Sequence, residues 1–267
     1  MTPETSKAAV RSRRGAAPNL SLLEAAIERG GLHPHFHAKY SVASRRITGV
    51  EALARIAGPQ AALMSPAPYV ELAERNNRID ALTLAMARGV ASHVADFNRI
   101  ASVPCSINIS PVSLDRPDFA AQIASVIAET GLACSQFTLE ISEARDAIYG
   151  PHASATMATL RDLGFGLAVD DFGAGTTNID RLRQFPFTEV KIDPAFTRLA
   201  MQEAFAKAAM VSCVKLAKDL GFRVVAEGIE TQEMLDFMKW LGVDEAQGFL
   251  FSRPMSPGEF RELLKQR

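Results

Sequence analysis

The segment from Gly166 to Gly175 reads GLAVDDFGAG. It begins as a short apolar run of the kind that forms a buried strand, continues with two adjacent aspartates, and ends with glycines that permit a sharp turn. The next β-type run follows at Thr188–Ile192, after a helix-like segment. A strand, a polar turn and a helix make one βα unit, so this part of the chain predicts a parallel sheet.

The same alternation of β runs and helical periodicity extends along the chain. Helices are predicted over Leu20–Arg29, with Gly30 and Gly31 as its stop, and over Pro68–Glu74 and Ile79–Asp96. Strands are predicted over His33–Tyr40, Ile47–Leu53, Val103–Ile109, Phe137–Ile141, Gly166–Val169, Thr188–Ile192, Phe222–Ala226 and Asp244–Gly248. This count favours one closed α/β barrel, since no Gly-rich dinucleotide fingerprint supports an open doubly wound sheet. The first two strands are too close in sequence for a crossover helix, so we expect an antiparallel hairpin there.

Length and composition are those of an ordinary globular chain. The sequence has 267 residues, of which 48% are hydrophobic, and a formal net charge of -1. That charge argues against bulk electrostatic binding to DNA, RNA or a membrane surface, so a small-molecule partner is expected. We expect a flexible N-terminal tail at residues 1–18 and a single barrel domain at residues 19–267.

The cellular location is predicted from the cysteines and the hydropathy pattern. Cys105, Cys134 and Cys213 are widely spaced and flanked by apolar residues, so we interpret them as reduced thiols. The N-terminal segment lacks the apolar core of a secretory signal, and no run is long and apolar enough for a membrane span. A cytoplasmic protein is therefore expected.

Polar side chains stand at or near the carboxyl ends of the predicted strands, where β/α barrels gather their catalytic groups. They are Glu51, Asn108, Glu140, Asp170, Asp171, Lys191, Glu227 and Gln247. Mutual repulsion among so many carboxylates in one barrel mouth would push several of them towards protonation unless a cation neutralises them, so a metal ion is implied. Oxygen donors without cysteine or histidine favour Mg²⁺ or Mn²⁺ over zinc, and two ions are expected.

The adjacent aspartates need a particular backbone to act together. Consecutive strand residues point to opposite faces, so Asp170 and Asp171 both reach the mouth only if the strand ends there and the chain turns, as Gly173 and Gly175 permit. One carboxylate could then bridge two ions. Lys191 would project into the same acidic mouth as a charged ammonium, able to orient a water or neutralise a phosphate.

Seven short motifs also occur in order along the chain. They are EALAR at Glu51–Arg55, NIS at Asn108–Ser110, LEISE at Leu139–Glu143, DDFGAG at Asp170–Gly175, KID at Lys191–Asp193, AEGIET at Ala226–Thr231 and QGF at Gln247–Phe249. Together they resemble the EAL family of cyclic di-GMP phosphodiesterases over almost the whole chain. The resemblance implies a modified TIM-type (β/α)8 barrel with an antiparallel first strand, and metal-dependent hydrolysis of cyclic di-GMP to linear pGpG.

The resemblance also implies a role for each site residue. Glu51, Asn108, Glu140 and Asp170 would hold the first ion, while Asp170 and Asp171 would share the second. Glu227 would be a general base or a further metal ligand, Lys191 would position the attacking water, and Glu143 would hold the glycine loop. Arg55, Asp193 and Gln247 would line the nucleotide and phosphate site. The loop after Asp171 would join the metal site to a homodimer contact.

Three positions depart from the family pattern. His37-Ala38 stands where the family has Gln-Pro against a guanine, so we expect His37 to contact the base by a hydrogen bond or by stacking, with weakened binding. Thr176 replaces an aromatic in the glycine loop, and Ile56 replaces the aromatic after the motif arginine. The alternative is therefore an EAL domain that binds cyclic di-GMP or a protein partner without turnover. A third interpretation is a magnesium-dependent barrel lyase with Lys191 as its base.

Overall fold

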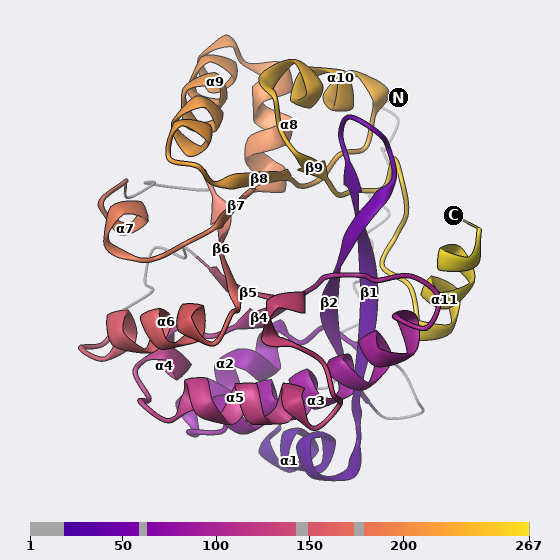
Figure 1. The fold of residues 1–267 in the computed structure, drawn as a ribbon, viewed down its shortest axis with the longest axis vertical. Helices are drawn as coiled ribbons and strands as arrows, with labels where there is room; N and C mark the ends of the chain where they lie inside the picture. The colour runs from indigo at the N-terminus through magenta and orange to yellow at the C-terminus, as the bar shows by residue number, and fades with distance from the viewer. Residues whose placement is uncertain (1–18, 59–62, 143–148, 174–178, 267) are drawn as a thin grey trace, which may run out of the picture.

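One sheet curls into a closed barrel in the computed structural model, which describes residues 19–58, 63–142, 149–173 and 179–266. Its strands are β1 (Leu32–Ser41), β2 (Ile47–Ala57), β3 (Leu63–Met64), β4 (Cys105–Ile109), β5 (Phe137–Ser142), β6 (Gly166–Phe172), β7 (Glu189–Ile192), β8 (Arg223–Ala226) and β9 (Glu245–Ala246). Their order is β1-β9-β8-β7-β6-β5-β4-β2-β3, and the pairing of β1 with β2 closes the ring (Figure 1). The short β3 is attached to β2 outside the ring. The modified TIM-type barrel predicted from the sequence is confirmed.

The first strand breaks the parallel order of the barrel. β1 runs antiparallel to both of its neighbours, β2 and β9, whereas β2 and β4 to β9 pair in parallel. The hairpin pairs Leu32 with Ile56 at one end and Tyr40 with Ile47 at the other. The predicted hairpin and all the predicted strands are therefore present. Only β3 was not predicted, because two residues are too few to give a periodic signal.

Helices surround the barrel (Figure 1). They are α1 (Leu20–Arg29), α2 (Ala67–Arg75), α3 (Ile79–Phe97), α4 (Pro111–Leu114), α5 (Phe119–Ala128), α6 (Ala153–Asp162), α7 (Ile179–Gln184), α8 (Pro194–Gln202), α9 (Ala204–Asp219), α10 (Gln232–Leu241) and α11 (Pro257–Lys265). α1 has the predicted bounds, with Asn19 as its N-cap and Gly30 (φ 77°) as its left-handed C-cap. Within the described ranges, no helix has the length and apolar character needed to cross a membrane.

Aromatic side chains pack the helices α3 and α11 against β1. Phe97 of α3 meets Phe36 of β1 and Phe260 of α11 edge to face, with ring centroids 5.0 and 4.9 Å apart. The backbone of Phe36 also exchanges two hydrogen bonds with Met255, just before α11. The C-terminal helix therefore packs beside the first strand, as Figure 1 shows.

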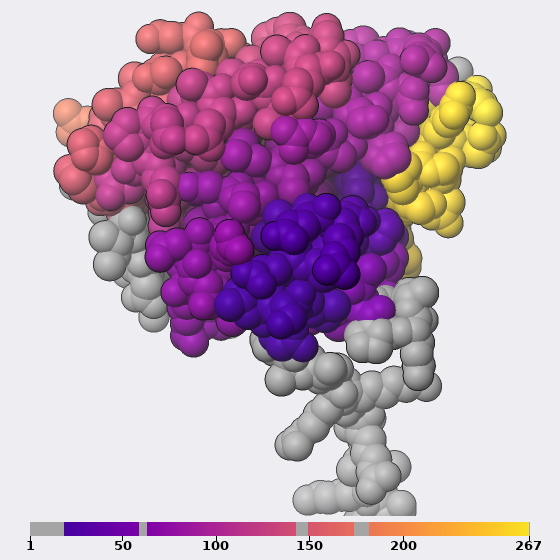
Figure 2. Space-filling model, turned by 90° about the horizontal axis from the view of Figure 1, so that it is seen from below, coloured from indigo at the N-terminus to yellow at the C-terminus, as the bar shows by residue number. Residues whose placement is uncertain are grey.

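A smaller apolar cluster fixes α1 to the barrel. Leu23 and Ala26 of α1 pack with Ile56 of β2, Tyr69 of α2 and Leu82 of α3. Figure 2 shows this face, with α1 in indigo against the purple residues that follow it and α11 in yellow at the edge. α1 therefore covers one side of the barrel without entering the ring.

Two further predictions concern the thiols and the chain ends. The three cysteines are not joined in disulfides with one another; Cys105 is buried, and Cys134 and Cys213 are half-buried. The predicted tail at residues 1–18 lies outside the described residues, so the division into a tail and a single domain at 19–267 stays a prediction.

Candidate active site

Eight of the predicted site residues lie on or directly after neighbouring strands of the barrel. Glu51 stands in the middle of β2, which continues to Ala57, and the others stand at or near the carboxyl ends. Glu51 is on β2, Asn108 on β4, Glu140 on β5, Asp170 and Asp171 on β6, and Lys191 on β7, while Glu227 directly follows β8 and Gln247 directly follows β9. Parallel register carries them to the same end of the ring, since Asn108 pairs with Glu140. The structure thus brings together side chains that are far apart in the sequence.

The ammonium of Lys191 is the centre of this group. Its Nζ lies 2.7 Å from Glu140 Oε2, 2.8 Å from Glu227 Oε1, 3.1 Å from Asp170 Oδ1 and 3.5 Å from Glu51 Oε1. Lys191 is only 1% exposed. Four carboxylates around one buried ammonium leave an excess of negative charge, which is unfavourable unless protons or cations are added.

Burial and neighbouring charges separate the pKa values of these acids. Burial raises the pKa of Asp170 to about 7 and that of Glu227 to about 8, against the attraction of Lys191. Burial acts in the same direction on Glu140, but the ammonium groups of Lys191 and Lys39 outweigh it and lower the pKa of Glu140 to about 2. The mouth therefore holds one firmly ionised carboxylate beside two that carry protons near neutral pH.

Lys191 itself stays charged, as predicted. Burial alone would lower the pKa of its ammonium. The carboxylates of Glu140, Glu51, Glu227 and Asp170 outweigh burial and raise that pKa well above its ordinary value. Lys191 therefore acts as a fixed positive charge in the mouth.

A second buried ammonium, which was not among the residues predicted from the sequence, lies deeper in the barrel. Lys39 of β1 donates to Glu140 Oε1, Glu189 and Ser106. Ser106 and Glu189 each stand two residues before a mouth residue on their strands, so this layer lies toward the strands' amino ends. Burial would lower the pKa of Lys39, but the two carboxylates raise it above its ordinary value. The sequence did contain a signal for this residue, because Lys39 stands two residues after His37 and therefore on the same face of the strand.

A chain of hydrogen bonds fixes Glu51 from another side. Asn108 Nδ2 donates to Glu51 Oε1 at 3.1 Å, and Gln247 Nε2 donates to Glu51 Oε2 at 2.7 Å. The same Gln247 nitrogen lies 2.7 Å from His37 Nδ1, and His37 Nε2 lies 3.0 Å from the carbonyl oxygen of Ser252. Because a carbonyl can only accept, His37 carries its proton on Nε2 and accepts at Nδ1. Both ring nitrogens of His37 are engaged, so a nucleobase could contact His37 only through the face of the imidazole ring.

The imidazole of His37 and the amide oxygen of Gln247 indicate how a ligand could bind beside these hydrogen bonds. Burial lowers the pKa of His37 to about 4, which keeps the imidazole neutral and able to accept from Gln247. The amide oxygen Oε1 of Gln247 is buried and has no hydrogen-bond partner among the described residues. An unpaired acceptor beside the acids is a polar atom that a ligand or a water can satisfy.

A kink in β6 brings both aspartates to the mouth. Asp171 has a left-handed backbone conformation (φ 60°), and the register between β6 and β7 shifts between Val169 and Phe172. Gly173, one of the glycines expected to permit the turn, is also left-handed (φ 93°), so the turn involves both residues, and β6 continues to Phe172 rather than ending at Val169. Ser142 Oγ donates to Asp171 Oδ2 at 3.0 Å. Positive φ is uncommon outside glycine and is frequent at functional sites.

Two predicted site residues in the described ranges, Arg55 and Asp193, are not part of this cluster. Arg55 Nη1 donates to the carbonyl oxygen of Ala54 at 2.7 Å. Asp193 caps α8 by accepting the backbone N–H of Phe196 at 2.9 Å. Neither lines the cavities described next. Glu143 belongs to residues 143–148, which lie outside the described residues.

Two cavities flank the acidic cluster. One, of about 550 Å³, lies between β2, β4 and the helices α2 and α3, and the other, of about 370 Å³, is lined by residues that follow β8 and β9. Glu51, Leu53 and Asp170 line both, so the cavities meet beside the cluster. Phe249 lines the smaller one, is 51% exposed, and has the guanidinium of Arg253 at 4.1 Å from its ring centroid.

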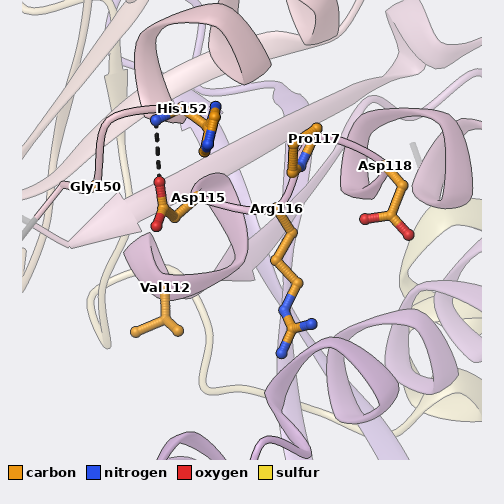
Figure 3. Close-up of a pocket in the computed structure, with 7 residues that line it drawn as sticks. All are labelled: Val112, Asp115, Arg116, Pro117, Asp118, Gly150 and His152. Atoms are coloured by element: carbon orange, nitrogen blue, oxygen red, sulfur yellow. Dashed lines mark hydrogen bonds between the residues drawn. The ribbon is translucent and has the colours of Figure 1, made fainter.

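A separate surface hollow of about 640 Å³ lies between the loops at α4 and α6 (Figure 3). It shares no lining residue with the acidic cluster. Asp115 Oδ1 accepts the backbone N–H of His152 at 3.0 Å, drawn as the dashed line in Figure 3, and Arg116 pairs with Asp80 at 2.8 Å. Its charged groups thus have partners within the chain, and we assign it no function.

The donor set of the mouth fits hard divalent cations. As the side chains lie, no group of three or more His, Cys, Asp or Glu residues in the described ranges is arranged as ion ligands, because the carboxylates are turned onto Lys191. The same carboxylates nevertheless gather around one positive charge within 3.5 Å. Oxygen donors of this kind are the ligands that Mg²⁺ and Mn²⁺ prefer.

Known proteins of similar sequence and structure fall in one family. The EAL domain family model matches residues 21–254. Cyclic di-GMP phosphodiesterase PA2567 of Pseudomonas aeruginosa is 33% identical over 92% of this chain and 42% of its own length, and cyclic di-GMP phosphodiesterase RocR of the same species is 30% identical over 91% and 62%. This chain thus spans less than two thirds of either relative.

Solved structures agree in fold. The PaMucR phosphodiesterase in complex with c-di-GMP superposes with a TM-score of 0.82 at 27% identity, over 90% of this chain and 98% of that chain. The EAL enzyme Bd1971, in a form with cAMP and cyclic di-GMP bound, gives a TM-score of 0.85 at 26% identity, over 92% and 68%. The chain therefore belongs to the EAL domain family.

Proposed function

We propose that this chain is a metal-dependent phosphodiesterase that hydrolyses cyclic di-GMP to linear pGpG. The observation that carries this proposal is the cluster of carboxylates around Lys191, which opens onto two joined cavities. Its excess negative charge suits divalent cations, and a phosphodiester anion needs such cations for hydrolysis. The relatives named as cyclic di-GMP phosphodiesterases support the same substrate.

The oxygen donors at the mouth would hold Mg²⁺ or Mn²⁺, and we propose two ions. Glu51, Asn108, Glu140 and Asp170 would bind the first, while Asp170 and Asp171 would share the second. When bound, the ions would supply positive charge to the phosphoryl oxygens and lower the pKa of water. The kink at Asp171 supports this sharing, because it brings adjacent carboxylates to the same side of the strand.

Glu227 would accept the proton of the attacking water, and Lys191 would supply a positive charge beside it. Burial raises the pKa of Glu227 to about 8, so the metal-free protein carries a proton there near neutral pH. Bound cations would displace that proton, and the carboxylate could then take up a proton from the attacking water. Lys191 lies 2.8 Å from Glu227 and would orient that water while holding the carboxylate in place. Glu143, outside the described residues, would hold the glycine loop.

The two cavities would receive the two halves of the substrate. Cyclic di-GMP contains two guanosines joined by two phosphodiesters, so a phosphate over the acidic cluster leaves one nucleoside on each side. The face of Phe249, supported by Arg253, offers a stacking surface in the smaller cavity, where His37 and Gln247 also lie. Arg55 and Asp193 would have to leave their present partners to contact the substrate.

Turnover of cyclic di-GMP, followed by chromatography with Mg²⁺ or Mn²⁺ present, tests the proposal. Glu51→Ala removes a cluster carboxylate, and Glu262→Ala on exposed α11 is the matched control. We expect metal-dependent release of pGpG by the unaltered protein and by Glu262→Ala, and none by Glu51→Ala. Absence of pGpG from the unaltered protein under all metal conditions would contradict the activity.

One observation favours binding without turnover as a second candidate function. His37 stands where the resemblance places a glutamine, and both of its ring nitrogens are engaged within the protein. Tight binding of cyclic di-GMP without product would support this receptor function. The barrel lyase is disfavoured, because the carboxylates around Lys191 raise the pKa of its ammonium and oppose a role as a base.

We also propose a cytoplasmic location and a homodimer. Cysteines that are not joined in disulfides agree with a reducing compartment. The dimer contact would use the loop after Asp171, residues 174–178, which lies outside the described residues. Cross-linking and sedimentation of the purified chain would measure the dimer directly.

A further inference from the structure

Acceptors from three different strands hold the ammonium of Lys39. Its Nζ lies 2.7 Å from Ser106 Oγ on β4, 2.9 Å from Glu140 Oε1 on β5 and 3.1 Å from Glu189 Oε1 on β7. An ammonium has three hydrogens, so each hydrogen has an acceptor. Lys39 is 3% exposed. The position of Nζ is therefore fixed across the barrel interior.

Glu140 is shared between the two buried lysines. Its Oε1 accepts from Lys39, and its Oε2 accepts from Lys191 at 2.7 Å. Glu140 is 0% exposed. Because each oxygen has its own ammonium, the carboxylate is held in one orientation. Oε2 faces the mouth cluster, and Oε1 faces the deeper layer.

Glu189 supplies the counter-charge of the deeper layer. It is 4% exposed and stands two residues before Lys191 on β7. Lys39 thus bridges two buried carboxylates, Glu140 and Glu189, that would repel each other without it. One of these carboxylates belongs to the mouth, and the other does not contact it.

We propose that Lys39 is a positioning residue of the active site, which orients Glu140 so that Oε2 is presented to a divalent cation. This rests on the proposed function only in that the mouth binds such a cation. Lys39 lines neither cavity beside the cluster, so it acts through Glu140 and not on the substrate. Removing a residue that orients a metal ligand typically weakens metal binding about 10- to 100-fold.

A purely structural role for Lys39 gives a different expectation. Lys39→Met leaves Glu189 buried without an ammonium and Glu140 with only that of Lys191, and it destabilises the fold in either case. The double variant Lys39→Met/Glu189→Leu removes the surplus charge as well, and leucine brings no donor to Glu140. If charge balance were the whole role of Lys39, this double variant would recover both stability and metal affinity.

The experiment compares the unaltered protein, Glu189→Leu, Lys39→Met and the double variant at pH 8. Urea denaturation measures stability, and titration calorimetry measures Mn²⁺ affinity. We expect Glu189→Leu to bind Mn²⁺ within about threefold of the unaltered protein, since Lys39 still holds Glu140. We expect the double variant to be more stable than Lys39→Met yet to bind Mn²⁺ about 10-fold or more weakly. Unaltered Mn²⁺ affinity in the double variant would overturn the proposal, even if Lys39→Met alone does not fold.

The same data separate this proposal from the proposed activity. If the unaltered protein binds Mn²⁺ but releases no pGpG, the activity is contradicted, and the affinities still decide the role of Lys39. If the unaltered protein binds no Mn²⁺, the positioning role is overturned as well.

Discussion

Lys191 and Lys39 are both buried in the barrel interior and both contact Glu140, yet their surroundings differ in charge. Lys191 meets four carboxylates, whereas Lys39 meets two carboxylates and a hydroxyl. The deeper layer satisfies every donor of its ammonium. The mouth layer keeps surplus carboxylates and the unpaired oxygen of Gln247. A fold needs the first arrangement for packing, while the second becomes favourable only when a ligand supplies positive charge and donors.

Lys191→Met should give the largest effect, because it removes the ammonium that contacts all four mouth carboxylates. At pH 8 we expect the free energy of unfolding to fall by about 3–5 kcal/mol, the usual cost of stranding buried charge. Turnover of cyclic di-GMP should fall by about 100-fold or more. Urea denaturation and the chromatographic assay measure the two effects.

The control for this comparison is an exposed lysine. Lys215 pairs with Asp219 one helical turn away on α9, and its side chain is 73% exposed. Lys215→Met should leave both turnover and stability close to those of the unaltered protein. If Lys191→Met were as mild as Lys215→Met, the contrast between the mouth and an ordinary surface pair would be lost.

The second prediction concerns pH. Burial raises the pKa of Asp170 to about 7 and of Glu227 to about 8, whereas unfolded carboxyls titrate near about 4. Between these values the folded protein binds more protons than the unfolded chain, so the stability of the metal-free protein should fall as pH rises through this window. A divalent cation must displace those protons, so its affinity should rise about tenfold per pH unit for each proton displaced.

Thermal unfolding from pH 6 to 8.5, with and without Mn²⁺, measures this effect. The melting temperature of the metal-free protein should decrease with pH, and the increase caused by Mn²⁺ should grow. Glu227→Gln is the control, because it removes one titrating group and should flatten the upper part of the profile. A profile of the unaltered protein that is flat in both conditions would contradict the raised pKa values.

Sequence reasoning located the mouth because strand ends can be read from local patterns. Glu51, Glu140 and Lys191 each follow apolar β residues, and the parallel order places them together without knowledge of any contact. Lys39 was missed because its meaning depends on partners 67 to 150 residues away, on β4, β5 and β7. Gly173 has the positive φ that its prediction requires, but the left-handed conformation of Asp171 was missed, because residues other than glycine seldom adopt it.

The side-chain partners of the remaining residues could not be predicted for the same reason. Arg55 and Asp193 belong to recognisable motifs, but the structure gives them a neighbouring carbonyl and a helix cap. Their partners are set by rotamers and by capping geometry, which a one-dimensional pattern does not contain. The expected substrate contact of these residues therefore stays a prediction.

The smallest expected effect lies at the edge of the mouth, where His37 acts on Glu51 only through Gln247. His37→Phe keeps a planar ring but removes both ring nitrogens. The carbonyl of Ser252 loses its donor, and one donor of Gln247 loses its acceptor while the bond to Glu51 remains. A lost hydrogen bond of this kind costs about 1 kcal/mol, or about fivefold in Mn²⁺ affinity measured by calorimetry. His37→Gln restores an acceptor and should stay within about twofold of the unaltered protein. Equal losses of Mn²⁺ affinity in both variants would show that the shape of the ring, and not the hydrogen bond, holds Gln247. The mouth would then depend less on the hydrogen bonds from His37 to Glu51 than the deeper layer depends on Lys39.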